Sequence, residues 1–391
     1  MGLFKKMDDL LYSRFLEKFG SKPEYFVTSS GRFEVIGNHT DHNGGFCVAA
    51  SCDLAISGYL SKNRDDQVEL LSEGYEDISF KLDDLSLKKD EVGTSKGLVK
   101  GVAIYLKKHG YQIGGFSLVS KSTVFKGAGV SSSAAFESLI GEIFNALYND
   151  SKIDPLTLAK AGQYSENYYF DKKSGLLDQC AVCFGNISYM DFSSEDEIKV
   201  NTIDFPFDDM SFVIVNSGGS HADLSDLYSS IPTDMKNVAK KLGKQTLSEV
   251  SFDDVYVIKD QLSELEFSRA KHFFSENIRV KTLVDALKNK NKEAFLSAIR
   301  ESFISSRDNL KNMMVENHYE GSPLEACDLA YKYLGNKGAA KINGGGFAGS
   351  IIVCLPKSES ESFKRFMAKK YGENNVASVN INPYPPQVKK L

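Results

Sequence analysis

The stretch Lys126-Gly-Ala-Gly-Val-Ser-Ser-Ser-Ala-Ala135 places two glycines directly before three serines and two alanines. A β-branched and aromatic run precedes it, at 122–125, and the apolar spacing of a buried helix follows, over 134–147. The glycines let the backbone come close to a ligand, and the small side chains leave the N–H groups at the helix start accessible. Such a helix start binds anions, most commonly phosphate. The alternative is a serine-capped helix after a loop, and no Gly-Lys-Ser/Thr follows that would make a Walker A loop.

A second polar cluster lies in Gly31-Arg-Phe-Glu-Val-Ile-Gly-Asn-His-Thr-Asp-His-Asn-Gly-Gly45. Its first half alternates like a strand, and its second half gathers hydrogen-bonding side chains among three glycines. This composition suits a polyhydroxylated ligand or an ion, because each hydroxyl needs a donor or an acceptor. The alternatives are a polar surface turn and a metal site at His39, Asp41 and His42, whose spacing fits no established pattern of metal ligands.

Two further features lie around Lys173-Ser-Gly-Leu-Leu-Asp-Gln-Cys180. Asp178 stands close to an expected helix start, where a carboxylate is either an N-cap or a catalytic group, and this stretch alone favours the cap. Cys180 and Cys183 form a C-x-x-C pair. Because no second pair and no histidine at ligand spacing accompanies them, two small residues on an apolar helix face are favoured over a zinc or redox site.

A third glycine-rich segment, Gly338-Ala-Ala-Lys-Ile-Asn-Gly-Gly-Gly-Phe-Ala-Gly-Ser350, precedes an expected strand at 351–355. Neither helix nor strand explains three successive glycines. They allow two backbones, or a backbone and a phosphate, to touch.

Periodicity and turn residues predict the elements that must position these motifs. Helices are expected at 7–19, 97–109, 134–147, 157–169, 232–243, 267–289, 293–317, 324–334 and 359–371. Strands are expected at 25–28, 46–60, 116–119, 187–191, 212–216 and 351–355, and a polar loop at 217–230.

The chain has 391 residues, which is more than one hydrophobic core usually serves, so two domains are expected, at 1–200 and 201–391. The boundary falls in the acidic, turn-rich segment 193–207. A net charge of −5 argues against nucleic acid or a membrane surface as the partner. Without a bilayer-spanning apolar run or the apolar core of a signal peptide, the protein is expected to be cytoplasmic. We expect a monomer.

The three glycine motifs, in this order, resemble those of the GHMP small-molecule kinases and, within them, the galactokinases. The first is similar to the galactokinase segment Gly-Arg-Val-Asn-Leu-Ile-Gly-Glu-His-Thr-Asp-Tyr-Asn-Gly-Gly, and the second to Gly-x-Gly-Leu-Ser-Ser-Ser-Ala. Gly175-Leu-Leu-Asp-Gln179 is similar to Gly-Ile-Met-Asp-Gln. Ser268–His272 and Glu276–Arg279 are also galactokinase-like, so the resemblance covers nearly the whole chain.

The resemblance implies an α+β fold with an S5-like N-terminal domain, a ferredoxin-like C-terminal domain and the active site in the cleft between them. It implies a sugar 1-kinase that uses ATP and Mg²⁺ to convert galactose to galactose 1-phosphate. By the same resemblance Asp178 is the catalytic aspartate, Arg32 is its partner, and Ser133 and Glu166 hold the metal. The residues that match the family's phosphate-binding positions are Gly127, Ala128, Gly129, Val130, Ser131, Ser132 and Ser133. Those that match its sugar contacts are Asn38, His39, Thr40, Asp41, Gly175 and Tyr228.

The chain departs from the family pattern at the sugar. Asn38 stands where the family has the glutamate that faces the sugar's 6-hydroxyl, and His42 stands where it has tyrosine. Because an amide can hold a hydroxyl or donate to a carboxylate, galactose is the predicted substrate and galacturonate or another sugar the alternative. Asn38→Glu is then expected to lower galacturonate activity and to leave galactose activity equal or better. A non-catalytic sugar sensor on the same fold is the alternative of another class, and the presence of Asp178, Arg32, Glu166 and Ser133 together favours an enzyme.

Overall fold

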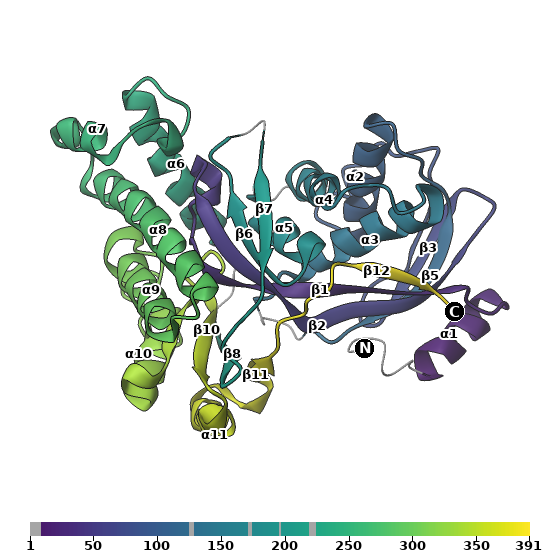
Figure 1. The fold of residues 1–391 in the computed structure, drawn as a ribbon. Coiled ribbons are helices and arrows are strands. Elements are labelled where there is room, and N and C mark those ends of the chain that lie inside the picture. Colours follow the sequence, from purple (N-terminus) through teal and green to yellow (C-terminus); the bar gives the residue numbers. More distant parts are fainter. Residues whose placement is uncertain (1–8, 125–128, 171–173, 195–196, 219–223) are drawn as a thin grey trace.

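The computed structural model describes residues 9–124, 129–170, 174–194, 197–218 and 224–391 (Figure 1). Its first sheet has the strand order β12-β1-β2-β5-β3-β4, with β6 on β2 and β7 on β6. These strands are β1 Tyr25–Ile36, β2 Phe46–Lys62, β3 Gln67–Ser72, β4 Ile78–Lys81, β5 Phe116–Ser122, β6 Ile187–Asp191, β7 Lys199–Ile203 and β12 Gln387–Lys390. The pairings are antiparallel except that of β3 with β5.

Helices cover both faces of this sheet (Figure 1). One face packs against α2 Ser95–Lys108, α3 Ser132–Tyr148, α4 Pro155–Tyr169 and α5 Leu177–Phe184, and the other against α1 Asp9–Phe19. Neighbouring strand residues divide between the two faces, as a period of two requires. On β2, Leu60 joins the core beneath α2 to α5, whereas Tyr59 joins the smaller cluster beneath α1.

The second sheet has the order β11-β8-β10-β9. Its strands are β8 Met210–Gly218, β9 Ala339–Asn343, β10 Gly349–Pro356 and β11 Val376–Val379. The helices in the same half of the chain are α6 Ser225–Lys241, α7 Phe252–Val257, α8 Glu264–Lys288, α9 Lys292–Ser305, α10 Pro323–Leu334 and α11 Lys357–Tyr371. Alternation again divides the faces, because Val213 and Val215 pack toward α10 and α11, whereas Phe212 and Ile214 share a core with β1 and β2.

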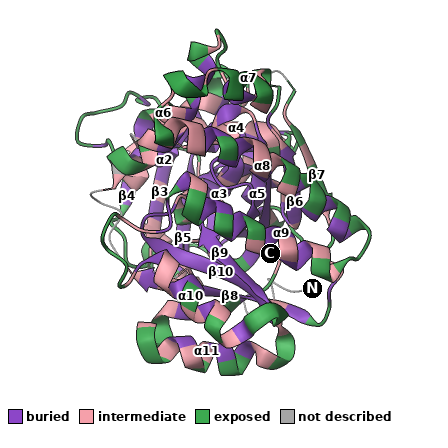
Figure 2. Cartoon of the chain, turned by 90° about the vertical axis from the view of Figure 1, so that its left-hand side faces the viewer, coloured by how far each residue is buried: buried purple, intermediate pink, exposed green. Residues whose placement is uncertain are grey.

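The strand β1 therefore lies between the two sheets' cores, and all but the first of its residues are buried. Figure 2 shows the same layering, with buried strands inside and exposed residues on the outer helix faces. The pairing of β1 with β2 is irregular between Ser30 and Arg32 and again between Glu34 and Ile36. Such irregularities re-aim side chains and are common next to functional sites.

The α+β class is confirmed, and most of the expected elements are present. Four expectations were wrong in extent. The strand at 25–28 runs on to Ile36, a strand occupies 199–203 where turns were expected, and α6 begins at Ser225 inside the expected polar loop. The helix expected to reach 317 ends at Ser305 and continues as a π-helix only to Leu310, because Lys311 is left-handed (φ 57°).

The change from one sheet to the other falls between Ile203 and Met210, so we propose the domain boundary there. The C-terminal strand β12 pairs with β1 and so belongs to the first sheet. The expected division into 1–200 and 201–391 assigns these residues to the second domain instead. Cys180 and Cys183 are buried free thiols on α5, and burial raises the pKa of both, in keeping with a packing role. Among the described helices, none is long and apolar enough to cross a membrane.

Candidate active site

An ion pair joins the first motif to α5. Arg32 on β1 meets the Asp178 carboxylate with two parallel hydrogen bonds, Nε to Oδ1 at 2.5 Å and Nη2 to Oδ2 at 2.7 Å. Burial lowers the pKa of Arg32, but the charge of Asp178, the hydrogen bonds to it and the charge of Glu34 together outweigh this effect, and the pKa is raised. The two-pronged geometry fixes both side chains. The Asp178 side chain is 23% exposed against 7% for Arg32, so the carboxylate is the member of the pair that solvent reaches.

This geometry corrects the interpretation of Asp178 as a helix cap. The N-cap of α5 is Leu176, and no side-chain hydrogen bond caps the helix. Asp178 lies in the first turn of α5 instead. Its carboxylate contacts Arg32, which lies on β1, 146 residues earlier in the chain. A negative charge in the first turn is also favoured by the helix dipole.

The glycine loop lies against the same arginine. Arg32 donates from its backbone N–H to the Val130 carbonyl at 2.9 Å and from Nη1 to the Gly129 carbonyl at 2.6 Å. Gly129 has a φ of 68°, and a Cβ there would lie 2.0 Å from the Ser350 hydroxyl, so the close approach requires glycine. Gly127 and Ala128 lie outside the described residues.

The first turn of α3 is not capped by the side chain of its N-cap serine, so the alternative of a serine-capped helix does not hold. Ser131 is the N-cap residue in a left-handed conformation (φ 54°), and it makes no side-chain cap hydrogen bond. Ser132 is exposed at the start of the helix. The N–H groups of this turn are therefore not satisfied by Ser131, which is the condition for binding an anion at a helix start.

Ser133 and Glu166 meet across α3 and α4. The Ser133 hydroxyl donates to Glu166 Oε1 at 2.5 Å, and Glu166 is fully buried. Gln179, the residue after Asp178, donates through Nε2 to Glu166 at 3.0 Å and to Glu137 at 3.1 Å. The helix that carries Asp178 is thus tied to the Ser133–Glu166 pair by one amide.

The polar loop after β1 folds back on itself. The Thr40 hydroxyl bonds the Gly37 and Phe46 carbonyls at 2.9 and 2.8 Å and is fully buried, so it holds the turn. Asp41 opens the 3-10 helix Asp41–Asn43 and lies against Gly175, where an added Cβ would be 1.7 Å from Asp41 Oδ2. Gly175 and Asp41 are thus brought together, as the resemblance implied, although they are 134 residues apart in sequence.

His39 and Tyr228 lie beside the third motif. His39 Nε2 donates to the Gly345 carbonyl at 2.8 Å, and burial, then the charge of His42, lowers its pKa to about 3. A neutral ring that donates through Nε2 keeps Nδ1 as an acceptor. Tyr228 on α6 packs on Gly345, where a Cβ would be 1.8 Å from the ring, and lies 6.4 Å from His39 between ring centres.

Asn38 is placed differently from its sequence interpretation. It is 1% exposed, and its amide donates to both Glu34 carboxylate oxygens, at 3.1 and 3.0 Å, and to the Gly344 carbonyl at 2.8 Å. Its Oδ1 accepts from Asn312 at 2.7 Å. Since both N–H groups serve the protein, Asn38 as placed does not offer a donor to a sugar.

Comparison with known proteins places this arrangement in a family. A model of the galactokinase galactose-binding signature matches residues 13–62, and one of the GHMP kinase N-terminal domain matches 97–186. The galactokinase of Lactococcus lactis subsp. cremoris is 31% identical over 377 residues, 93% of this chain and 91% of that protein. The galactokinase of Lactobacillus helveticus is 31% identical over 88% of each chain. The chain belongs to the galactokinase family.

Solved structures agree. The crystal structure of Lactococcus lactis galactokinase complexed with galactose superposes with a TM-score of 0.84 at 27% identity, over 98% of this chain and 99% of that one. A crystal structure of mevalonate kinase reaches 0.63 at 14% identity and shows the fold alone. This galactokinase-family chain therefore has the two-domain GHMP kinase fold that the resemblance implied.

Two oxygens of this family member suit Mg²⁺. The Ser133 hydroxyl and the Glu166 carboxylate are hard donors side by side, the kind that Mg²⁺ uses together with substrate phosphates and water. Among the described residues no group of three or more His, Cys, Asp or Glu could hold a metal ion. His39, Asp41 and His42, which are all described, therefore do not form such a group.

Sequence reasoning missed a buried charge network in this galactokinase-family site. Lys341 on β9 is fully buried and pairs with Glu34 on β1 at 2.6 Å. Asn343 accepts from the Glu34 backbone N–H at 2.9 Å and donates to the Gly129 carbonyl at 3.0 Å. The available signal was charge within buried strands, Arg32 and Glu34 on β1 and Lys341 on β9, because buried charges are found paired.

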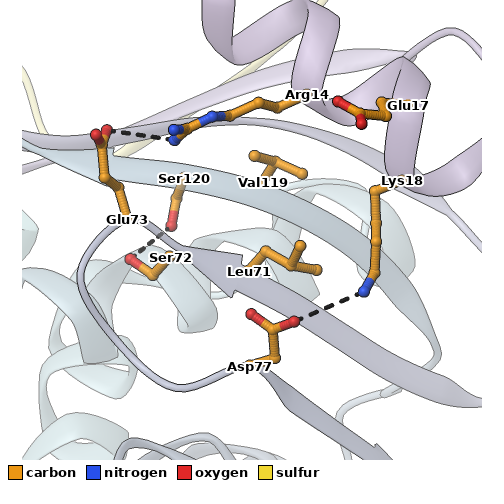
Figure 3. Close-up of a pocket in the computed structure, with 9 residues that line it drawn as sticks. All are labelled: Arg14, Glu17, Lys18, Leu71, Ser72, Glu73, Asp77, Val119 and Ser120. Atoms are coloured by element: carbon orange, nitrogen blue, oxygen red, sulfur yellow. Dashed lines mark hydrogen bonds and ion pairs between the residues drawn. The ribbon is translucent and has the colours of Figure 1, made fainter.

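A separate pocket lies outside this site, between α1 and the neighbouring strands β3 and β5 of the first sheet (Figure 3). Arg14 pairs with Glu73 at 3.7 Å and Lys18 with Asp77 at 3.6 Å across its mouth. None of the motif residues lines it, and its charged side chains are about half exposed. It has no part in the galactokinase-family site.

Proposed function

We propose that this member of the galactokinase family transfers the γ-phosphoryl group of ATP to the anomeric hydroxyl of galactose. The observation that carries the proposal is the Arg32–Asp178 pair, which lies against the glycine loop that precedes α3. A carboxylate and an anion-binding helix start at one place are what a kinase needs to hold a hydroxyl beside a phosphate. The galactokinase relatives supply galactose and ATP as the first substrates to test.

The residues perform the transfer by positioning and charge. Asp178 accepts the hydrogen bond, and then the proton, of the sugar's O1 as that oxygen bonds to the γ-phosphorus and the bond to the ADP oxygen breaks. Arg32 keeps Asp178 ionised and orients it, because an opposite charge in contact favours the charged form. The α3 start holds the phosphates, and Mg²⁺ bound at Ser133 and Glu166 would neutralise charge that develops on them.

The sugar is held from the other side by the loop after β1. His39 keeps an acceptor at Nδ1, Asp41 supplies a carboxylate braced by Gly175, and Tyr228 packs over Gly345. Acceptors of this kind suit sugar hydroxyls, which are donors. The galacturonate alternative relied on an N–H of Asn38, and both N–H groups of that amide are used by the protein. Galactose is therefore favoured over galacturonate.

The test is a coupled ADP-release assay at saturating ATP and Mg²⁺ over galactose, galacturonate, glucose and mevalonate, with the product position determined by NMR. Galactose 1-phosphate as the product, with kcat/KM at least about tenfold above the other acceptors, is expected. Tight binding of galactose and ATP without ADP release would instead identify a sugar sensor. Turnover of galacturonate alone would refute the assignment of the sugar. Size-exclusion chromatography tests whether the protein is a monomer.

A further inference from the structure

Glu34 and Asn38 occupy each other's places in the first motif. The galactokinase segment Gly-Arg-Val-Asn-Leu-Ile-Gly-Glu has an amide at its fourth position and a carboxylate at its eighth, and this chain has the carboxylate at 34 and the amide at 38. The two exchanged side chains contact each other, at 3.0 to 3.1 Å from the Asn38 amide to the Glu34 carboxylate. The exchange therefore keeps one amide and one carboxylate in the motif, but it moves the negative charge from the eighth position to the fourth, Glu34.

The carboxylate end is neutralised from the second sheet. Lys341 donates to Glu34 at 2.6 Å and to the Ile342 carbonyl at 2.7 Å. Burial raises the pKa of the Glu34 carboxyl, and the charge of Lys341 opposes that rise. Because Lys341 is fully buried and Glu34 nearly so, either partner left alone would be a buried uncompensated charge.

The amide end holds the third glycine motif. Asn38 donates to the Gly344 carbonyl, and its Oδ1 accepts from Asn312. The Asn312 side chain donates in turn to the Gly345 carbonyl at 3.0 Å, and the Asn312 backbone carbonyl accepts from the Phe347 backbone N–H at 2.5 Å. Two asparagines, Asn38 through its side chain and Asn312 through its side chain and backbone, thus fix the path of 344–347, a segment whose glycines alone would leave it free to move.

The position of that segment matters for the site, because its two sides touch the catalytic and sugar residues. A Cβ at Gly344 would lie 3.7 Å from Arg32 Nη2, and Gly345 lies against Tyr228 and accepts from His39. We propose that Glu34 and Asn38 act as one exchanged pair that positions the third glycine motif against Arg32 and Tyr228. Asn38 is then a positioning residue. The kinetic part of the test relies on the proposed galactose kinase activity, and the exchange part does not.

The experiment is a double-mutant cycle with Glu34→Asn, Asn38→Glu and the two combined, which restores the family's arrangement. Hydrogen–deuterium exchange of the peptide that covers 343–347 reports the segment directly, and galactose KM and kcat report the site. Each single change is expected to speed exchange there by about tenfold or more and to raise galactose KM by about tenfold. In the combined variant the amide at 34 and the carboxylate at 38 can pair again, but a carboxylate at 38 cannot donate to the Gly344 carbonyl. The combined losses in both readouts are therefore expected to be clearly smaller than the product of the single losses, without full recovery.

Glu91→Gln is the matched control, because Glu91 pairs with the buried Lys100 at 2.7 Å far from the motif. It should lower stability without changing exchange at 343–347 or galactose KM. If a single variant does not fold, Glu34→Gln, Asn38→Asp and their combination repeat the cycle with nearly unchanged side-chain volume.

Losses in the combined variant equal to the product of the single losses would overturn the pair. Restored exchange with a galactose KM that no variant alters would overturn the positioning role. A parent protein that does not turn over galactose would refute the proposed function, and the exchange cycle would still decide whether Glu34 and Asn38 act together.

Discussion

Asp178→Asn removes one negative charge and keeps the shape of the side chain. In the protein, Asp178 accepts two hydrogen bonds from the Arg32 guanidinium, which is 7% exposed. The asparagine oxygen can accept one of these bonds, but its NH₂ group faces another donor. The variant therefore leaves the arginine charge largely uncompensated and removes the proton acceptor from the site.

The magnitudes follow from that geometry. Two opposite charges about 4 Å apart attract by roughly 4 kcal/mol at an effective dielectric constant near 20. Because the Asp178 side chain is 23% exposed and one hydrogen bond survives, we expect the free energy of unfolding to fall by about 2–3 kcal/mol. Loss of the proton acceptor should lower kcat by about 10²- to 10⁴-fold. Galactose affinity should stay within about tenfold, which is 1.4 kcal/mol.

Urea unfolding, galactose binding by calorimetry and the ADP-release assay measure these three quantities on one preparation. Asp253→Asn, a change of the same kind on the exposed start of α7, is the control for charge alone. A kcat within tenfold of the parent would remove Asp178 from the chemistry. A loss of galactose binding as large as the loss of kcat would mean that the residue only maintains the structure.

The remaining predictions test the metal, the sugar loop and pH. Glu166→Ala should raise the Mg²⁺ concentration for half-maximal activity more than Ser133→Ala, because a carboxylate binds a hard cation more strongly than a hydroxyl; unchanged Mg²⁺ titrations for both would exclude them as ligands. Gly175→Ala should raise galactose KM about tenfold but alter stability by less than about 1 kcal/mol, since its Cβ meets only side-chain atoms of Asp41 and no backbone; an unaltered KM would contradict this. Because the pKa of His39 is lowered to about 3, the unfolded chain takes up the proton first, and stability present above pH 6.5 is lost as pH falls, by roughly 2 kcal/mol at pH 5. His39→Asn, which tolerates the positive φ of 60° there, should remove that part of the loss in unfolding measured at pH 7 and 5, and an equal slope in both proteins would refute it.

The sequence predicted best the contacts that lie within one motif. The strand before the loop at 38–45 and the helix after Ser133 follow from local patterns of apolar and turn residues. The partner of Arg32 was reached only through the family resemblance, because Asp178 is 146 residues away and its own surroundings look like a helix start. A local pattern reports whether a carboxylate can cap a helix, but it does not report a charge that approaches from another strand.

The C-terminal return of the chain was the least predictable part of the fold. Gln387–Lys390 carries two lysines and follows three prolines, a composition typical of a tail, and yet it pairs with β1. Four residues of an edge strand contribute little local signal, and their pairing is fixed by the free edge that β1 offers. The π-helix Ser306–Leu310 was hidden for a similar reason, since its sequence continues the helical pattern of α9.

The exchanged pair shows why a residue interpreted by its position in a motif can receive the wrong role. From the motif alone, Asn38 is an uncharged residue at a position where the family has glutamate. Restoring the glutamate is then expected to leave galactose activity unchanged or better. In the structure a glutamate at 38 would bring a second carboxylate to within hydrogen-bond distance of Glu34, where a single Lys341 is buried to neutralise them. Like charges in contact at a buried place are costly, so Asn38→Glu by itself should lower galactose activity, and only the accompanying Glu34→Asn makes it tolerable. The meaning of position 38 is thus set by what occupies position 34.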